Sequence, residues 1–114
     1  MNSYMFLFWA PKHLVAAPRS PEQARESGAR WHAWAEELKE AGHSVTGAQL
    51  EAVGQCVRGA QKIVAEGPFG GDHLMGGYFI VSASSLEQAT ELAKGCPVLQ
   101  NSGTVEVRPI METD

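Results

Sequence analysis

The sequence predicts an α+β fold in which an antiparallel sheet carries two helices on one face. Three observations predict it: two apolar runs too short for buried helices, two helix-capping signatures, and a final segment with period-two alternation. Their order is strand, helix, hairpin, strand, helix, strand, which is the ferredoxin-like split βαβ plan. A chain of 114 residues has room for one domain, and we expect residues 1–114 to form it.

Local signals predict the first strand and the start of the first helix. Residues 4–9 (YMFLFW) form a compact apolar run that is closed by Pro11, which indicates a strand. Ser20 stands one residue before Pro21 and three before Gln23. This is the pattern of an N-cap, a proline at the first helical position and a capping-box partner, so we expect a helix from Pro21.

The expected helix has one apolar face and a clear end. Ala24, Trp31 and Leu38 recur every seven residues, and Trp34 lies beside them. Gly42 supplies the C-terminal stop.

The second half of the chain predicts a hairpin, a strand, a helix and a strand. Residues 52–69 indicate two short strands that turn near Gly59, and residues 78–83 (YFIVSA) indicate a further strand. Ser84 and Ser85 start a short helix, whose apolar stripe is Leu86, Ala89, Ala93 and Cys96. Residues 104–110 (TVEVRPI) alternate as a strand, and the proline within them favours a sheet edge.

Two of the expected strands are apolar on both faces. Residues 6–9 (FLFW) and 78–81 (YFIV) present large side chains in both directions. In the split βαβ plan these strands are central, and the helices cover only one face. The other face would leave an apolar patch in water, so we expect a partner sheet, most simply in a homodimer.

Composition excludes several classes of partner. The formal charge is −4 and no basic stripe is interleaved with aromatic residues, so we expect no direct contact with nucleic acid. The N-terminal apolar run is interrupted by Lys12 and His13, so we expect neither a signal peptide nor a membrane span. The histidines are scattered and show no metal-ligand spacing, so we expect no metal and no cofactor.

The two cysteines indicate a reduced, cytoplasmic protein. Cys56 and Cys96 are too few for a disulfide framework and form no CxxC pair. Cys96 is expected at a helix C-terminus, where the negative end of the helix dipole opposes a thiolate. We therefore expect both cysteines to serve packing.

Three segments resemble the YCII-related, or DGPF-domain, family: VAEGPF, GGYFIVSASSLEQATELAKGCPVL and GTVEVRPIME. In that family a DGPF turn leads to GGYY, a strand, a short helix ending in CP, and a last strand VEVRP. The similarity runs from about Thr46 to Glu112. It implies a ferredoxin-like fold that dimerises face to face into an α/β barrel, as in muconolactone isomerase. For part of the family it also implies an association with extracytoplasmic-function sigma factors.

The chain departs from the family pattern at residues that would carry chemistry. Glu66 replaces the aspartate of DGPF, and Asp72 and His73 stand where a KE pair is common. For some members the resemblance implies a His and Asp dyad, with its histidine on the first helix. Counted back from Leu38, the position of the family's histidine is occupied by Trp31 in this chain. His32 is the next residue, and its side chain points about 100° further around the helix.

Four residues are candidate acid–base groups: Glu66, His32, His73 and Asp72. Glu66 would act as a general base at the barrel mouth or cap the amides of its own turn. Asp72 and His73 point in opposite directions if their segment is extended, which opposes a shared role. His32 precedes Glu36 by one helical turn, which fits an exposed pair or an imidazole oriented by a carboxylate.

A ligand pocket would be lined by Trp9, Trp31, Trp34, Pro68, Phe69, Tyr78 and Arg108. Trp9 ends a central strand, where a barrel mouth would form. Core packing is the alternative role of the tryptophans. Glu106 shares one face of the last strand with Arg108, and we expect the two to pair across the sheet or the dimer.

Two functions are compatible with these features. The first is a small-molecule-binding or regulatory homodimer, with an aromatic pocket and a helix face available to a partner such as a sigma factor. The second is a dimeric α/β-barrel enzyme, isomerase-like or hydrolase-like, that uses Glu66 with His32 or His73 as general acid and base. The binding function needs only a cavity and an exposed face, whereas the enzyme needs these groups to converge.

Overall fold

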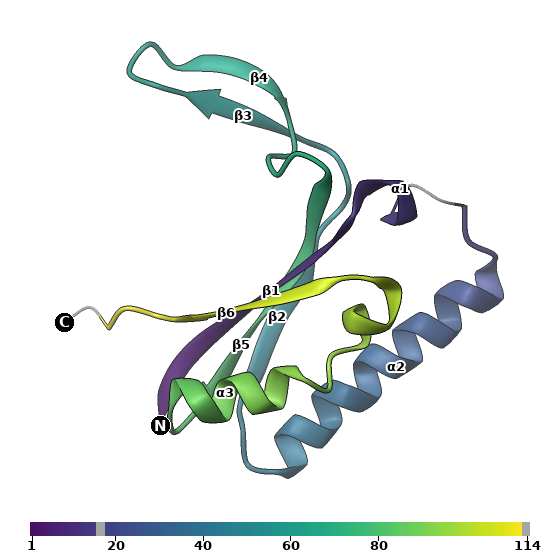
Figure 1. Ribbon diagram of the computed structural model, residues 1–114, viewed down its shortest axis with the longest axis vertical. Helices are drawn as coiled ribbons and strands as arrows, with labels where there is room; N and C mark the ends of the chain where they lie inside the picture. The colour runs from purple at the N-terminus through teal and green to yellow at the C-terminus, as the bar shows by residue number, and fades with distance from the viewer. Residues whose placement is uncertain (16–17, 113–114) are drawn as a thin grey trace.

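The computed structural model describes residues 1–15 and 18–112 and contains a four-stranded antiparallel sheet with helices on one face (Figure 1). The elements in order are β1 (Asn2–Pro11), α1 (Lys12–Val15), α2 (Pro21–Glu40), β2 (Val45–Gln49), β3 (Gly54–Arg58), β4 (Ile63–Gly67), β5 (His73–Ala83), α3 (Leu86–Ala93), the 3-10 helix η1 (Pro97–Asn101) and β6 (Thr104–Pro109). The sheet order is β2-β5-β1-β6, so the two strands apolar on both faces are central, as predicted. The α+β fold class is confirmed.

The start of α2 has the hydrogen bonds that its sequence predicts. The Ser20 hydroxyl accepts from the backbone N–H of Gln23 at 3.1 Å, and the Gln23 side chain accepts from the Ser20 N–H at 2.9 Å. This capping box satisfies two of the backbone donors that a helix leaves free at its N-terminus. The helix ends where expected, because Gly42 adopts a φ of +97° that favours glycine.

An aromatic cluster joins α2 to the sheet. Trp34 is 5% exposed and stacks between Phe6 of β1, with ring centroids 6.1 Å apart, and Phe79 of β5, at 5.3 Å. Trp31 meets Phe8 edge to face at 4.7 Å. Three even-numbered side chains of β1, Tyr4, Phe6 and Phe8, are buried on this face of the sheet.

Helix α3 packs on the same face of the sheet as α2. The Ser85 hydroxyl caps it by accepting from the Gln88 N–H at 3.1 Å. Ala89 and Ala93 are buried in the same core as Trp34. Leu86, expected on the apolar stripe, is instead 46% exposed at the first turn, before the helix reaches the sheet.

The predicted hairpin forms, but it lies outside the main sheet. Strands β3 and β4 pair only with each other, and the sheet position next to β5 is taken by β2. No local sequence pattern predicts β2, because Gly47 and Ala48 weaken its β-propensity and only Val45 is half-buried. The hairpin is therefore an insertion between two neighbouring strands.

Two further details differ from the expected elements. The one-turn helix α1 directly follows β1, at a place where the sequence predicts no helix, and Ala16 and Ala17 lie outside the described residues. Ala24, expected on the apolar stripe of α2, is exposed, so the buried part of the stripe begins further along the helix.

Replacing the central indole of the core tests this packing. We expect Trp34→Ala to lower the free energy of unfolding by about 3–5 kcal/mol, because it leaves a cavity between two aromatic rings. Arg25→Ala on the exposed side of the same helix should change it by less than about 0.5 kcal/mol. Urea unfolding at a fixed protein concentration measures both, and equal effects would contradict the assigned core.

Candidate functional site

The sheet face turned away from α2 and α3 carries large apolar side chains that are only half-buried. On β1 these are Met5, Leu7 and Trp9, and on β5 they are Tyr78 and Ile80. Strand register places them on one surface with two charged residues of β6, because Leu7 lies opposite both Tyr78 and Glu106, and Met5 opposite both Ile80 and Arg108. We call these seven residues the open face.

A hydrogen bond crosses the open face. The Trp9 indole Nε1 donates to Glu106 Oε1 at 3.1 Å. Glu106 and Arg108 share this face, as predicted, but the carboxylate is bonded to Trp9. In the part of the chain that the structure describes, the guanidinium of Arg108 makes no side-chain hydrogen bond or ion pair. The open face thus offers an oriented carboxylate and a cation amid apolar surface.

The segment after the hairpin packs against Trp9. Gly70 has a φ of +138°, and a Cβ there would lie 3.0 Å from Cζ3 of Trp9 and 2.6 Å from the carbonyl oxygen of His73. A side chain at this position would be strained and would collide with both neighbours. The carbonyl of Asp72 accepts from the Lys12 N–H at 2.8 Å, which ties the segment to the end of β1. The segment therefore walls one end of the open face.

Positive φ explains only part of this segment's glycine content. Gly70 and Gly71 have positive φ, whereas Gly67, Gly76 and Gly77 do not. Gly77 is needed for a close strand approach instead, since a Cβ there would lie 2.8 Å from the carbonyl oxygen of Ala48.

The four candidate acid–base residues lie on three different elements and are all exposed. His32 is on α2, Glu66 is on hairpin strand β4, and His73 is the first residue of β5, with Asp72 in the turn directly before it. Within residues 1–15 and 18–112, no side-chain hydrogen bond or ion pair joins any two of them. Glu36, proposed as a partner of His32, lies 3.6 Å from Lys39. This arrangement does not assemble a dyad within one copy.

The seven candidate ligand-binding residues fall into three groups. Trp31 and Trp34 pack beneath α2 on the covered face of the sheet. Three others lie on the open face: Trp9, Tyr78 and Arg108. Pro68 and Phe69 belong to the segment after β4, where Phe69 is 76% exposed. One pocket cannot include the first two groups, because the sheet separates them.

Cys96 is buried in the core between α3 and η1 and is 3% exposed. Burial raises the pKa of its thiol from 9.0 to about 12, against the smaller lowering effect of a hydrogen bond with the backbone of Val98. A thiol with this pKa stays protonated and is a poor nucleophile, in agreement with the predicted packing role. Cys56 lies half-buried on β3, and both thiols are free.

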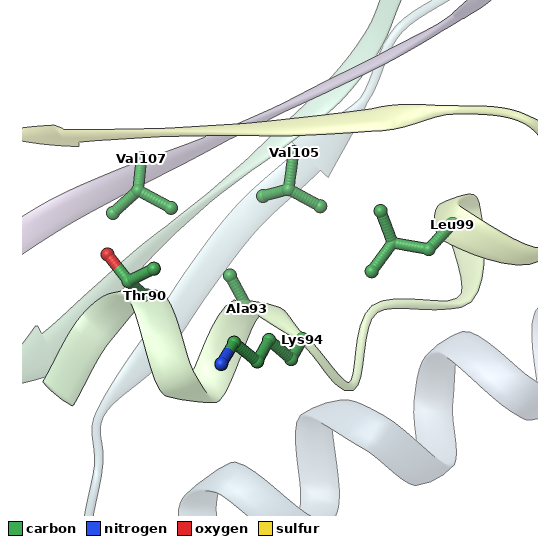
Figure 2. A pocket seen from close by; sticks show the side chains of 6 residues that line it. All are labelled: Thr90, Ala93, Lys94, Leu99, Val105 and Val107. Carbon is green, nitrogen blue, oxygen red and sulfur yellow. The ribbon is translucent and has the colours of Figure 1, made fainter. Parts of the chain in front are cut away.

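A groove of about 180 Å³ lies between α3, η1 and β6 (Figure 2). It is lined by Thr90, Ala93, Lys94, Leu99, Val105 and Val107. Val105 and Val107 point from β6 toward the helix, and the Lys94 ammonium is bound to Glu91 at 2.7 Å. The groove contains none of the predicted site residues and is mostly apolar.

The described residues contain neither a cluster of metal ligands nor a helix that could span a membrane. No three His, Cys, Asp or Glu side chains come together there in a way that could hold a metal ion. No described helix is long and apolar enough to cross a membrane.

The open face includes three of the ligand-binding residues predicted from the sequence, Trp9, Tyr78 and Arg108, together with Glu106, which the sequence predicts only as a structural partner. Met5, Leu7 and Ile80 of the same face are not among the predicted site residues. The alternation within residues 78–81 could have found Ile80 beside Tyr78. The contact of Trp9 with Glu106 spans 97 residues along the chain, and no local pattern signals such a pairing.

The family model described as YCII-related domain matches residues 5–114, nearly the whole chain. No curated protein matches the chain.

The burial of Cys96 predicts unequal reactivity of the two thiols. At pH 8 we expect iodoacetamide to modify Cys56 and to leave Cys96 unmodified, because the Cys96 thiol is buried and its pKa is raised. In denaturant both thiols should react. Mass spectrometry of tryptic peptides measures the two rates, and comparable native rates would contradict the assignment.

The same shift predicts a loss of stability in alkali. Above pH 9 the Cys96 thiol ionises in the unfolded chain but stays protonated in the folded one, so the unfolded state binds fewer protons. The contribution of the Cys96 thiol to the free energy of unfolding is therefore complete below pH 9 and is lost as the pH rises toward 12. Urea unfolding at pH 8 and at more alkaline pH should show a larger decrease for the wild type than for Cys96→Ala, and equal decreases would refute the linkage.

Proposed function

This chain belongs to the YCII-related domain family, and on that premise we propose that it is a small-molecule-binding homodimer with one domain per copy. The open faces of two sheets pack against each other and enclose the ligand site. A reducing compartment such as the cytoplasm is part of the proposal, since Cys56 and Cys96 are both free thiols.

The observation that carries the proposal is the composition of the open face. Its five large apolar side chains are half-buried at the centre of a four-stranded sheet, and helices cover only the opposite face. A sheet with an apolar surface on each side is stable when both are covered. A second copy covers this face with the same surface, which is the isologous contact of a twofold dimer.

The polar groups within this surface suggest the class of ligand. Binding sites are mostly apolar with a few placed polar groups, and here Trp9, Glu106 and Arg108 supply them. Trp9 and Tyr78 suit a flat apolar group. The guanidinium of Arg108 suits an anion, such as a carboxylate. We propose aromatic carboxylates as the ligand class.

The enzyme alternative has weaker support. General acid–base catalysis needs groups within hydrogen-bond reach of a shared reacting atom, but Glu66, His32 and His73 lie on separate elements and are exposed. A sigma-factor partner is not included, because no feature of the surface in the described ranges is specific to one.

A charge at the centre of the open face tests the dimer. We expect the wild type to be a dimer and Leu7→Lys to raise its dissociation constant at least about a hundredfold, because each copy would bury an unpaired ammonium. Leu86→Lys on the exposed start of α3 is the matched control and should leave the dimer intact. Sedimentation equilibrium measures all three. A wild type that stays monomeric at every concentration would sink the proposal.

A panel of aromatic carboxylates, beginning with benzoate, tests the ligand class. We expect binding to change tryptophan fluorescence and Arg108→Gln to weaken affinity about tenfold to a hundredfold without loss of the dimer. His32→Gln is a control on the other side of the molecule and should bind normally. Glu66→Gln distinguishes ligand binding from catalysis. If the variant binds the ligand as tightly as the wild type but loses a turnover that the wild type shows, the enzyme function is favoured.

A further inference from the structure

The β3–β4 hairpin and the residues beside it form the part of the described chain with the most exposed large apolar side chains. Of the eleven such side chains in the described residues, three lie on the hairpin (Val57, Ile63 and Val64) and three lie beside it (Leu50, Val53 and Phe69). Exposure is high, at 68% for Val57 and 61% for Val64. Scattered exposed residues are ordinary, but such a concentration marks an interaction surface.

The hairpin makes few contacts with the rest of its own copy in the described ranges. Val57 lies directly opposite Val64 on one face, while Ile63 lies on the other face. No other helix or strand in the described ranges makes an extended contact with β3 or β4. An isolated two-stranded hairpin is marginally stable in water, so both faces require cover for a well-ordered arm.

The hairpin extends toward the side of the open face. Figure 1 shows α2 on one side of the central strands and the hairpin reaching from their upper end toward the other side. It leaves the sheet between β2 and β5, at the end where the Gly70 turn contacts Trp9. A body that packs on the open face is therefore adjacent to the hairpin, and the two apolar surfaces act together.

The charge of the hairpin favours a second copy of this chain as that body. Residues 54–67 hold Arg58, Lys62 and Glu66, a formal charge of +1, so the rest of the chain holds −5 of the total −4. The two basic residues flank the turn at the hairpin tip. An arm with a basic tip and apolar faces is complementary to the acidic remainder of another copy.

We propose that the β3–β4 hairpin of each copy is an exchanged arm that packs on the other copy beside the shared ligand site. This rests on the proposed homodimer and adds the partner segment that flanks its site. Because the dimer is twofold symmetric, the arm of each copy packs on the other copy in the same way. The site is then incomplete in a single copy.

Crosslinking between distinguishable copies tests the arm directly. Val64→p-benzoylphenylalanine is prepared in unlabelled protein, mixed with ¹⁵N-labelled wild type, and irradiated. We expect crosslinks from position 64 to labelled peptides, whereas the same photoreactive residue at Leu86 gives none. This crosslinking experiment detects the contact between copies without a substitution designed to weaken that contact.

An affinity measurement accompanies the crosslinks. We expect Val57→Asp combined with Val64→Asp to raise the dimer dissociation constant roughly a hundredfold, while Leu86→Asp leaves it unchanged. Circular dichroism should show an intact core in both, because the arm makes no extended contact with the core elements in the described ranges. A normal dimer that crosslinks only within one copy and tolerates the double substitution overturns the arm but not the homodimer. A wild type that is always monomeric overturns both.

Discussion

The stack of Trp34 between Phe6 and Phe79 fixes helix α2 to one face of the sheet, and the rest of the molecule depends on that attachment. Because side chains of a strand alternate between faces, burying Phe6 and Phe8 beneath the helix turns Leu7 and Trp9 the other way. A polar residue at those alternate positions would have made the outer face an ordinary solvated surface. In this chain those positions hold Leu7 and Trp9, and their apolar side chains form part of the open face.

Register then determines which chemistry the open face contains. The pairing of β1 with β6 sets Glu106 opposite Leu7 and Arg108 opposite Met5, so both charges share a surface with Trp9. A slip of one residue would turn them to the covered face, where unpaired charges are costly. The Trp9 indole donates a hydrogen bond to the Glu106 carboxylate, whereas the Arg108 guanidinium makes no side-chain hydrogen bond or ion pair within the described residues.

Much of the fold follows from local signals, whereas the site follows from long-range geometry. The capping box of Ser20 and Gln23 and the alternation of residues 104–110 act within a few residues, and each predicted its element correctly. Strand β2 escaped prediction because its pairing with β5, rather than its own sequence, makes it a strand. The hairpin was predicted as an element but assigned to the wrong sheet, since a turn signal carries no information about neighbours. For the same reason the predicted pocket combined Trp9 with Trp34, which the sheet separates.

The glycine-rich segment links the arm to the site. It begins at the base of β4 and turns at Gly70 against the Trp9 ring, whose indole is bonded to Glu106. The backbone bond from Lys12 to the Asp72 carbonyl holds its other end to β1. In the proposed dimer, an arm that packs on a second copy would restrict this segment, and the segment would in turn restrict the Trp9 ring. The proposed dimer would thereby couple association to the orientation of Trp9 through contiguous contacts. Of the glycines in this segment, Gly70 is the one whose backbone approaches the Trp9 ring closely.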